Sequence, residues 1–274
     1  MALNQNCVLI AVVGGKGGVG KSVFAANLTA AMTAEMRTPV LLIDCDTKSV
    51  GDQNIITGLK PVKTLRELAT TTQSLNMTPL QQIVAQHQSG FAFLGAVRGP
   101  EEILSVNPEN LSKLIEFLSR TFKFIVVDCG NDIGPMQNTI LQDATAIALV
   151  ATPEILVVQQ TQRMINELMT QSYPKEMFQL VLNRVSSNGL QPQVISQHLG
   201  LMPMGLIPAD ENTVMASISQ SKPFVVANPK APISAAYFDF VRKLSSGTIQ
   251  RLKSFLMFLL PAFLGKCMKY FQPS

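Results

Sequence analysis

The sequence predicts an α/β protein with a mostly parallel, twisted sheet and helices on both of its faces. Short apolar runs rich in Val, Ile and Leu alternate with segments of helix length, the arrangement typical of βαβ units. The apolar runs are continuous rather than alternating, as expected for strands that are covered on both faces. A glycine-rich loop joins the first apolar run to the first helical segment.

The predicted elements follow this alternation along the chain. Pro108 comes directly after Asn107, which is typical of a helix start. The stretch from Gly51 to Gly90 is polar and weakly patterned, with one short helix expected around Leu65, Leu68 and Ala69. We expect strands at Val8–Val13, Pro39–Ile43, Phe91–Gly95, Phe124–Asp128, Ala146–Ala151, Gln179–Asn183 and Met204–Ile207. We expect the longer helices at Ser22–Glu35, Pro108–Thr121, Gln159–Ser172, Gln191–Leu199 and Ile233–Leu244.

Length and charge predict one large domain with a short appendage. The 274 residues are 47% hydrophobic and 15% charged, enough to build a sizeable core. The net charge of +4 is uneven, because six Lys or Arg and no Asp or Glu follow Asp239. The rest of the chain carries 16 Lys and Arg against 18 Asp and Glu. We therefore predict a domain over residues 1–246 and a basic tail over residues 247–274, separated by Ser245–Gly247.

Several features predict a cytoplasmic protein. The four cysteines form no CxxC pair and no metal-ligand spacing, a pattern typical of a reducing compartment. The first apolar run leads directly into the glycine loop without the features of a signal peptide. No apolar run reaches the roughly 20 residues needed to span a bilayer. Three Tyr and no Trp argue against a base-stacking surface for nucleic acid.

The glycine-rich loop predicts a nucleotide site of the P-loop type. Residues 15–22 read GKGGVGKS and match G-x-x-x-x-G-K-[ST], between a strand and a helix as the motif requires. Such a loop turns backbone N–H groups toward phosphates at a helix N-terminus. Lys21 would hold the β- and γ-phosphates, and the Ser22 hydroxyl would bind Mg²⁺. The predicted nucleotide-binding residues of this segment are Gly15, Lys16, Gly17, Gly18, Val19, Gly20, Lys21, Ser22 and Val23.

The second lysine of the loop, Lys16, gives the deviant form KGGVGKS, which resembles the MinD/ParA superfamily of ATPases. This resemblance implies ATP and Mg²⁺ as cofactors and a homodimer that sandwiches ATP. It implies that Lys16 reaches the phosphates of the partner subunit. It further implies that Lys16, Lys21 and Asp46 are catalytic, with slow hydrolysis that a partner protein stimulates.

Acidic residues end two of the predicted strands. Asp44 and Asp46 close the second strand, and Asp128 closes the Phe124–Asp128 strand. The resemblance implies that Asp46 orients the attacking water, that Asp44 supports the metal shell and that Asp128 reaches Mg²⁺ through water. The family often continues past the last of these with small residues and prolines, whereas residues 129–132 here read CGND.

The adenine side is predicted from two later segments. Residues 180–184, LVLNR, resemble the strand in which an asparagine bonds the base edge, here Asn183. Residues 207–210, IPAD, resemble the loop that closes over the base, with Pro208 and Asp210.

Within the superfamily, residues 44–69 and 94–103 are similar to the TadZ/CpaE group, as are 151–154 and 173–176. This resemblance implies an ATPase that localises Tad/Flp-type pilus machinery, commonly at a cell pole. Three other functions stay open: a ParA-type partition protein on DNA, a membrane-associated MinD-like or flagellar-number regulator, and an ATP-stabilised scaffold with little turnover. DNA binding requires a basic face, which the slightly acidic body does not offer.

The basic tail predicts an amphipathic helix from Thr248 to Leu260, within a segment over residues 248–271 that could contact a membrane. Ile249, Leu252, Leu256 and Leu259 recur at helical spacing, and Arg251 lies off that stripe. Such a segment suits the surface of an anionic membrane, at the inner face of the cell membrane. It also suits packing on the body or on a partner protein, and the sequence does not separate these uses.

Overall fold

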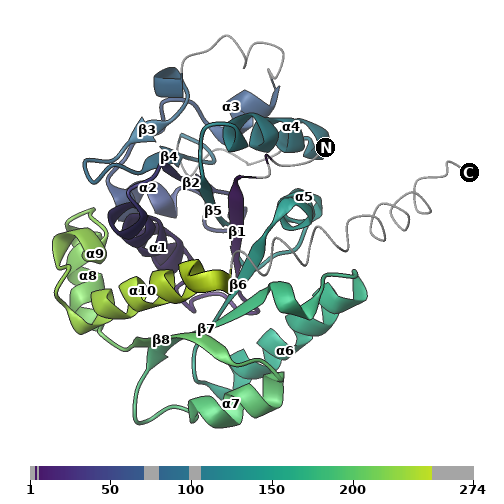
Figure 1. Cartoon of the computed structure of the whole chain (residues 1–274), viewed down its shortest axis with the longest axis vertical. Coiled ribbons are helices and arrows are strands. Elements are labelled where there is room, and N and C mark those ends of the chain that lie inside the picture. The colour runs from purple at the N-terminus through teal and green to yellow at the C-terminus, as the bar shows by residue number, and fades with distance from the viewer. Residues whose placement is uncertain (1–3, 5, 71–79, 99–105, 249–274) are drawn as a thin grey trace, which may run out of the picture.

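The protein's structure, a computed structural model, describes residues 4, 6–70, 80–98 and 106–248. Its centre is an eight-stranded sheet in the order β3-β4-β2-β5-β1-β6-β7-β8 (Figure 1). The strands are β1 (Val8–Val13), β2 (Val40–Asp44), β3 (Ala85–Gln86), β4 (Ala92–Leu94), β5 (Phe124–Asp128), β6 (Ala146–Ala151), β7 (Phe178–Val185) and β8 (Pro203–Pro208). All seven predicted strands are present, so the predicted mostly parallel fold is confirmed.

The central strands are buried from end to end. Every residue of β1, β2, β5 and β6 is buried, which explains why these strands are continuous apolar runs in the sequence. Strand β3 was not predicted, and it pairs antiparallel with β4 at the edge of the sheet. It is two residues long and belongs to a turn that His87 and Gly90 close, so its sequence carries no periodic signal.

Helices cover both faces of the sheet. Figure 1 shows α1 and α10 on one face and α4, α5 and α6 on the other. The helices are α1 (Lys21–Met36), α2 (Asp52–Thr57), α3 (Leu65–Thr70), α4 (Pro108–Ser119), α5 (Pro135–Asp143), α6 (Ile155–Thr170), α7 (Pro192–Leu199), α8 (Glu211–Ser219), α9 (Phe224–Ala227) and α10 (Pro232–Lys243). In the described ranges, 3₁₀ turns lie at Leu80–Gln82 and Lys175–Met177.

Four of these helices, α2, α5, α8 and α9, were not predicted, because each is short and none has a strong apolar stripe. Helix α5 is an example, since it begins at Pro135 after Gly134 and buries Met136, Ile140 and Leu141 among polar neighbours. Helix α6 begins at Ile155 rather than at the predicted Gln159. The predicted short helix near Leu65 is confirmed as α3.

Helix α1 is anchored by an aromatic cluster on the face that α10 covers. The ring of Phe24 lies 5.4 Å from that of Tyr237 and 5.5 Å from that of Phe240, between ring centroids. Phe224 of α9 meets Tyr237 at 5.2 Å in an edge-to-face contact. Each such ring pair contributes about 0.5–1.5 kcal/mol beyond the burial of its area. Because Phe24 lies three residues after Lys21, this packing fixes the first turn of α1 and the glycine loop before it.

The chain after α10 differs from the prediction. Helical backbone continues through a π-helical turn, η4 (Leu244–Thr248), so residues 245–247 do not end the helix. The rest of the predicted tail, residues 249–274, lies outside the described residues, and the division at residue 247 stays a prediction. Within the part of the chain that the structure describes, no helix combines the length and apolarity needed to cross a membrane.

Candidate nucleotide site

The glycine loop follows β1 at the carboxyl edge of the sheet and opens α1, as predicted. A β-carbon on Gly15 would lie 2.5 Å from the carbonyl carbon of Gln160 in α6. Gly20 precedes α1 with a φ of 92°, and a β-carbon there would lie 2.5 Å from Nδ2 of Asn183. The loop is therefore held between α6 and β7, and only glycine fits at these two contacts.

The middle of the loop, at Gly17 and Gly18, borders open space. A β-carbon on Gly17 or Gly18 would meet no atom within 4 Å. The backbone here can approach a ligand closely, which is the use of glycine in a phosphate cradle.

The two lysines of the loop lie in opposite environments. The Lys21 side chain is buried, and its Nζ donates to the carbonyl oxygen of Lys16 at 3.1 Å. Burial lowers the pKa of Lys21, while the nearby carboxylates of Asp128 and Asp46 act to raise it. Lys16 is exposed. The loop thus keeps one cation inside the site and presents the other to solvent.

Two buried carboxylates lie side by side beneath the loop. Asp44 and Asp128 are paired in register at the ends of β2 and β5. Burial raises the pKa of Asp44 well above its ordinary value, and the charge of Asp128 adds to this. Burial also raises the pKa of Asp128, although hydrogen bonds from Ser22 and Gln53 oppose the rise. A pair of this kind is best stabilised by a cation that neutralises both members.

Asp46 is buried, and its carboxylate accepts hydrogen bonds from the backbone of the residues that follow it. Its Oδ1 accepts the backbone N–H groups of Lys48 at 2.8 Å and Ser49 at 3.1 Å. A β-carbon on Gly130, whose φ is 68°, would lie 2.6 Å from the Asp46 carboxylate. Glycine at position 130 therefore leaves room for the Asp46 carboxylate. An exposed ion pair between Lys48 and Asp132, 3.6 Å long, also links the two segments.

Two glutamines of the site were not predicted. Gln53 of α2 donates through Nε2 to Oδ2 of Asp128 at 2.9 Å and to the carbonyl oxygen of Ser22 at 3.0 Å. Gln137 of α5 donates to the carbonyl oxygen of Cys45 at 3.0 Å. Both are buried, yet neither belongs to a motif and no sequence signal marks either one.

On the predicted adenine side, Asn183 reaches the loop while Asp210 is engaged elsewhere. Nδ2 of Asn183 donates to the carbonyl oxygen of Val19 at 2.8 Å. Pro208 ends β8, the strand next to β7. The carboxylate of Asp210 accepts the backbone N–H of Thr213 at 3.0 Å and caps α8, a role that explains this residue without a nucleotide. The adenine-side roles remain predictions.

The predicted metal partners fit a magnesium ion that is held jointly with phosphate. Mg²⁺ usually keeps several waters and is bound through one or two carboxylates together with substrate phosphates. Ser22 and Asp128 are in contact, and both oxygens of Asp44 accept backbone N–H groups, from Asp46 and Gly51. Among the described residues no three His, Cys, Asp or Glu side chains form a metal cluster. The donor set therefore suits magnesium with phosphate rather than a protein-only metal site.

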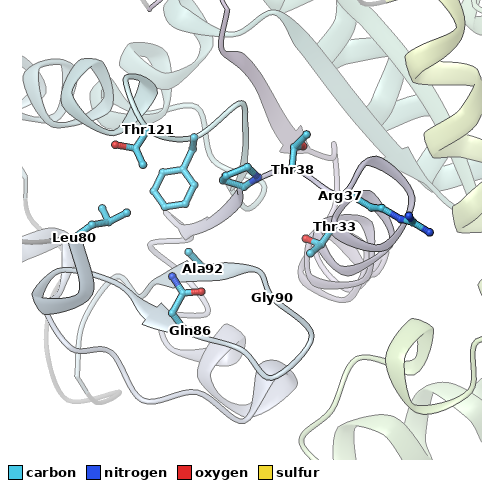
Figure 2. Close-up of a pocket in the computed structure, with 10 residues that line it drawn as sticks. Thr33, Arg37, Thr38, Leu80, Gln86, Gly90, Ala92 and Thr121 are labelled. Atoms are coloured by element: carbon cyan, nitrogen blue, oxygen red, sulfur yellow. The ribbon is translucent and has the colours of Figure 1, made fainter.

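A cavity of about 430 Å³ lies at the opposite edge of the sheet. Thr38 and Pro39 lead into β2 there, and Thr121 and Phe122 come just before β5. Figure 2 shows Gln86 and Ala92 on the side of the cavity across from Thr121. Because the glycine loop follows the carboxyl end of β1, this cavity is separate from the nucleotide site.

Together the sheet, the glycine loop and the acidic strand ends define a nucleotide-binding protein of the P-loop class. The chain belongs to the CobQ/CobB/MinD/ParA nucleotide binding domain family, whose pattern matches residues 10–224. It is 26% identical over 243 residues to the septum site-determining protein MinD of Bacillus subtilis, covering 86% of this chain and 88% of that protein.

Solved structures share the fold. A ParA family ATPase from Chlorobium tepidum superposes with a TM-score of 0.78 at 22% identity, covering 85% of this chain and 98% of that one. MinD of Pyrococcus horikoshii, solved with Mg-ADP, superposes with a TM-score of 0.74 at 22% identity, covering 88% and 96%. The predicted membership of the MinD/ParA superfamily is confirmed, and the narrower resemblance to the TadZ/CpaE group stays a prediction.

Proposed function

We propose that this chain is an ATP-dependent switch that binds MgATP, dimerises around it and hydrolyses it slowly. The observation that carries the proposal is the pair of lysines in one glycine loop, with Lys21 buried beside Asp46 and Asp128 and Lys16 exposed. The Mg-ADP in the MinD structure from Pyrococcus horikoshii supports the choice of ligand.

Each residue of the site has a role in this proposal. Lys21 and the loop N–H groups hold the phosphates, and Ser22 and Asp128 hold Mg²⁺, with Asp44 in support. The bound metal would neutralise charge that develops on the phosphates. Asp46 orients the attacking water once its carboxylate leaves the N–H groups of Lys48 and Ser49. Asn183, Pro208 and Asp210 border the adenine.

The surface beside the loop supports a second copy of the chain as the dimer partner. Ile155 and Leu156 begin α6 and are 61% and 62% exposed. They lie at the same carboxyl edge as Lys16, because Gly15 packs directly on the next turn of α6 at Gln160. Large apolar side chains beside an exposed cation suit an interface that forms only when ATP supplies the matching negative charge.

Replacing Asp46 with alanine is expected to trap the ATP-bound dimer. The change removes the carboxylate that positions water and leaves the phosphate cradle intact. We expect phosphate release to fall at least about tenfold while light scattering with ATP still reports a dimer.

Asp132→Ala is the matched control, since Asp132 is an exposed acid that pairs with Lys48 across the same site. We expect it to turn over ATP as the wild type does. Normal turnover in the Asp46 variant, or a loss only in the Asp132 variant, would show that the assignment to Asp46 is wrong.

The cargo of the switch is proposed from sequence resemblance. The segments similar to the TadZ/CpaE group favour recruitment of pilus-type secretion components to one place in the cell. Deleting the gene should then abolish or scatter pilus assembly. Intact pili together with a defect in division or chromosome segregation would move the chain to a MinD-like or ParA-like role.

The charge distribution of the chain bears on whether the switch works on DNA or on an anionic membrane. Up to Asp239 the chain is slightly acidic, which disfavours DNA, and four of the six cations that follow lie in the tail. The other two, Arg242 and Lys243, end α10. Tail-dependent pelleting with anionic vesicles would support a membrane role, and a tail-independent, salt-sensitive DNA shift would support a partition role.

A further inference from the structure

Gln53 lies at the centre of the site, although no motif contains it. It is fully buried in the first turn of α2. Nε2 donates one hydrogen to the backbone carbonyl oxygen of Ser22 and the other to Oδ2 of Asp128. Gln53 thus joins the two predicted magnesium partners, one from the loop and one from the sheet.

The other end of the same amide has no partner. Oε1 of Gln53 is buried and accepts no hydrogen bond. Buried carbonyl oxygens are nearly always satisfied in folded proteins, so this oxygen is a candidate acceptor for a bound water. Because the neighbouring groups are Ser22 and Asp128, a water of a magnesium shell is a donor of the right chemistry.

Helix α2, which carries this amide, contacts the acidic pair at one end and the segment after α8 at the other. At its start, the N–H of Gly51 donates to Oδ2 of Asp44 at 3.3 Å. At its end, a β-carbon on Gly58 would lie 2.5 Å from the carbonyl oxygen of Ser221, after α8. Helix α2 therefore lies between the acidic pair, at its start, and the segment that follows α8, at its end.

We propose that Gln53 is a positioning residue through which bound magnesium fastens α2 to the glycine loop. Its amide N–H groups set the spacing of Ser22 and Asp128, and its free Oε1 accepts a hydrogen from magnesium-bound water. This inference rests on the proposed function, because it requires a nucleotide and Mg²⁺ in the site.

The test compares nucleotide binding with and without the metal. A fluorescent ADP analogue is titrated into wild type, Gln53→Met and Gln179→Met, in Mg²⁺ and in EDTA. Gln179 is the matched control, since it is a buried glutamine at the amino end of β7, away from the glycine loop. Its side chain donates one hydrogen bond, to the backbone carbonyl oxygen of Glu176. We expect Gln53→Met to bind within about twofold of wild type in EDTA. Its gain in affinity from Mg²⁺ should shrink about tenfold, the loss typical when an outer-shell partner is removed.

A second variant separates the acceptor from the donors. Gln53→Glu keeps an oxygen at the position of Oε1, but its second oxygen replaces the amide group that donates to Asp128 Oδ2 and to the Ser22 carbonyl oxygen. Because the proposal needs these donors to set the spacing of Ser22 and Asp128, the gain in affinity from Mg²⁺ should fall in this variant as well. Melting of each variant in EDTA checks that it folds. Hydrogen exchange of residues 51–58 supplies a readout besides affinity, and Mg²⁺ should slow it in wild type and not in Gln53→Met.

Three results would overturn the proposal. Equal losses in Mg²⁺ and in EDTA would show that Gln53 only builds the loop. A Gln53→Glu variant that keeps the full magnesium gain of wild type would show that the amide donors do not set the spacing of Ser22 and Asp128. An unchanged magnesium gain in Gln53→Met would remove its role altogether. If wild type binds no nucleotide in either buffer, the proposed function itself fails.

Discussion

Lys21→Ala is expected to abolish nucleotide binding, with a loss of affinity of about a hundredfold or more. The buried ammonium of Lys21 is the cation inside the loop, and losing a charge-assisted contact to phosphate costs about 1.5–3 kcal/mol for each bond. Calorimetric titration with ATP and Mg²⁺ measures the change directly.

The control for this experiment is another lysine of the same region. Lys48 is exposed and pairs with Asp132, so Lys48→Ala removes a nearby cation without touching the loop. We expect its affinity for ATP to stay within about twofold of wild type, the effect of a surface pair. Melting of Lys21→Ala without nucleotide is also needed, because the change leaves Asp46 and Asp128 without the cation that faces them. ATP affinity in a folded Lys21→Ala protein equal to that of wild type would show that this loop does not bind phosphate.

Lys16→Ala is expected to separate binding from dimerisation. Lys16 is exposed, and only its backbone carbonyl contacts Lys21, so its side chain can be removed without disturbing the cradle. We expect the variant to bind ATP within a few-fold of wild type and to remain a monomer. Turnover should fall about a hundredfold or more, because a cation that reaches the phosphates stabilises the transition state.

Light scattering with ATP, and separately with ADP, measures the oligomeric state. Lys48→Ala again serves as the control and should dimerise with ATP as wild type does. A Lys16→Ala protein that dimerises and hydrolyses normally would rule out a role across the subunit interface. A variant that loses ATP affinity as severely as Lys21→Ala would instead place both lysines in one subunit's cradle.

Much of the core could be predicted because its signals are local. Val8–Val13, Phe124–Asp128 and Ala146–Ala151 were predicted with the bounds that the structure shows. Each is an unbroken apolar run, and such runs in an α/β chain have few other places to lie than a covered sheet. The glycine loop was predicted for a similar reason, since glycines at fixed spacing permit a backbone path that other residues cannot follow.

The failures lie where no local pattern exists. Helix α2 is six residues long and has no apolar stripe. Hydrogen bonds from Gly51 to Asp44 and from Gln53 to Asp128 hold it in place instead. The predicted nucleotide contact of Asp210 stays a prediction, and only the structure shows that its carboxylate caps α8.

The sequence by itself predicted seven of the eight described strands, six of the ten described helices and the loop with its two lysines. Only the tertiary structure decided which lysine is buried, that Gly130 makes room for Asp46, and that Gln53 joins Ser22 to Asp128. Gln53 and Asp128 are 75 positions apart in the chain. Contacts across such a separation depend on how the sheet and its helices pack, and neither residue's neighbours in sequence carry that information.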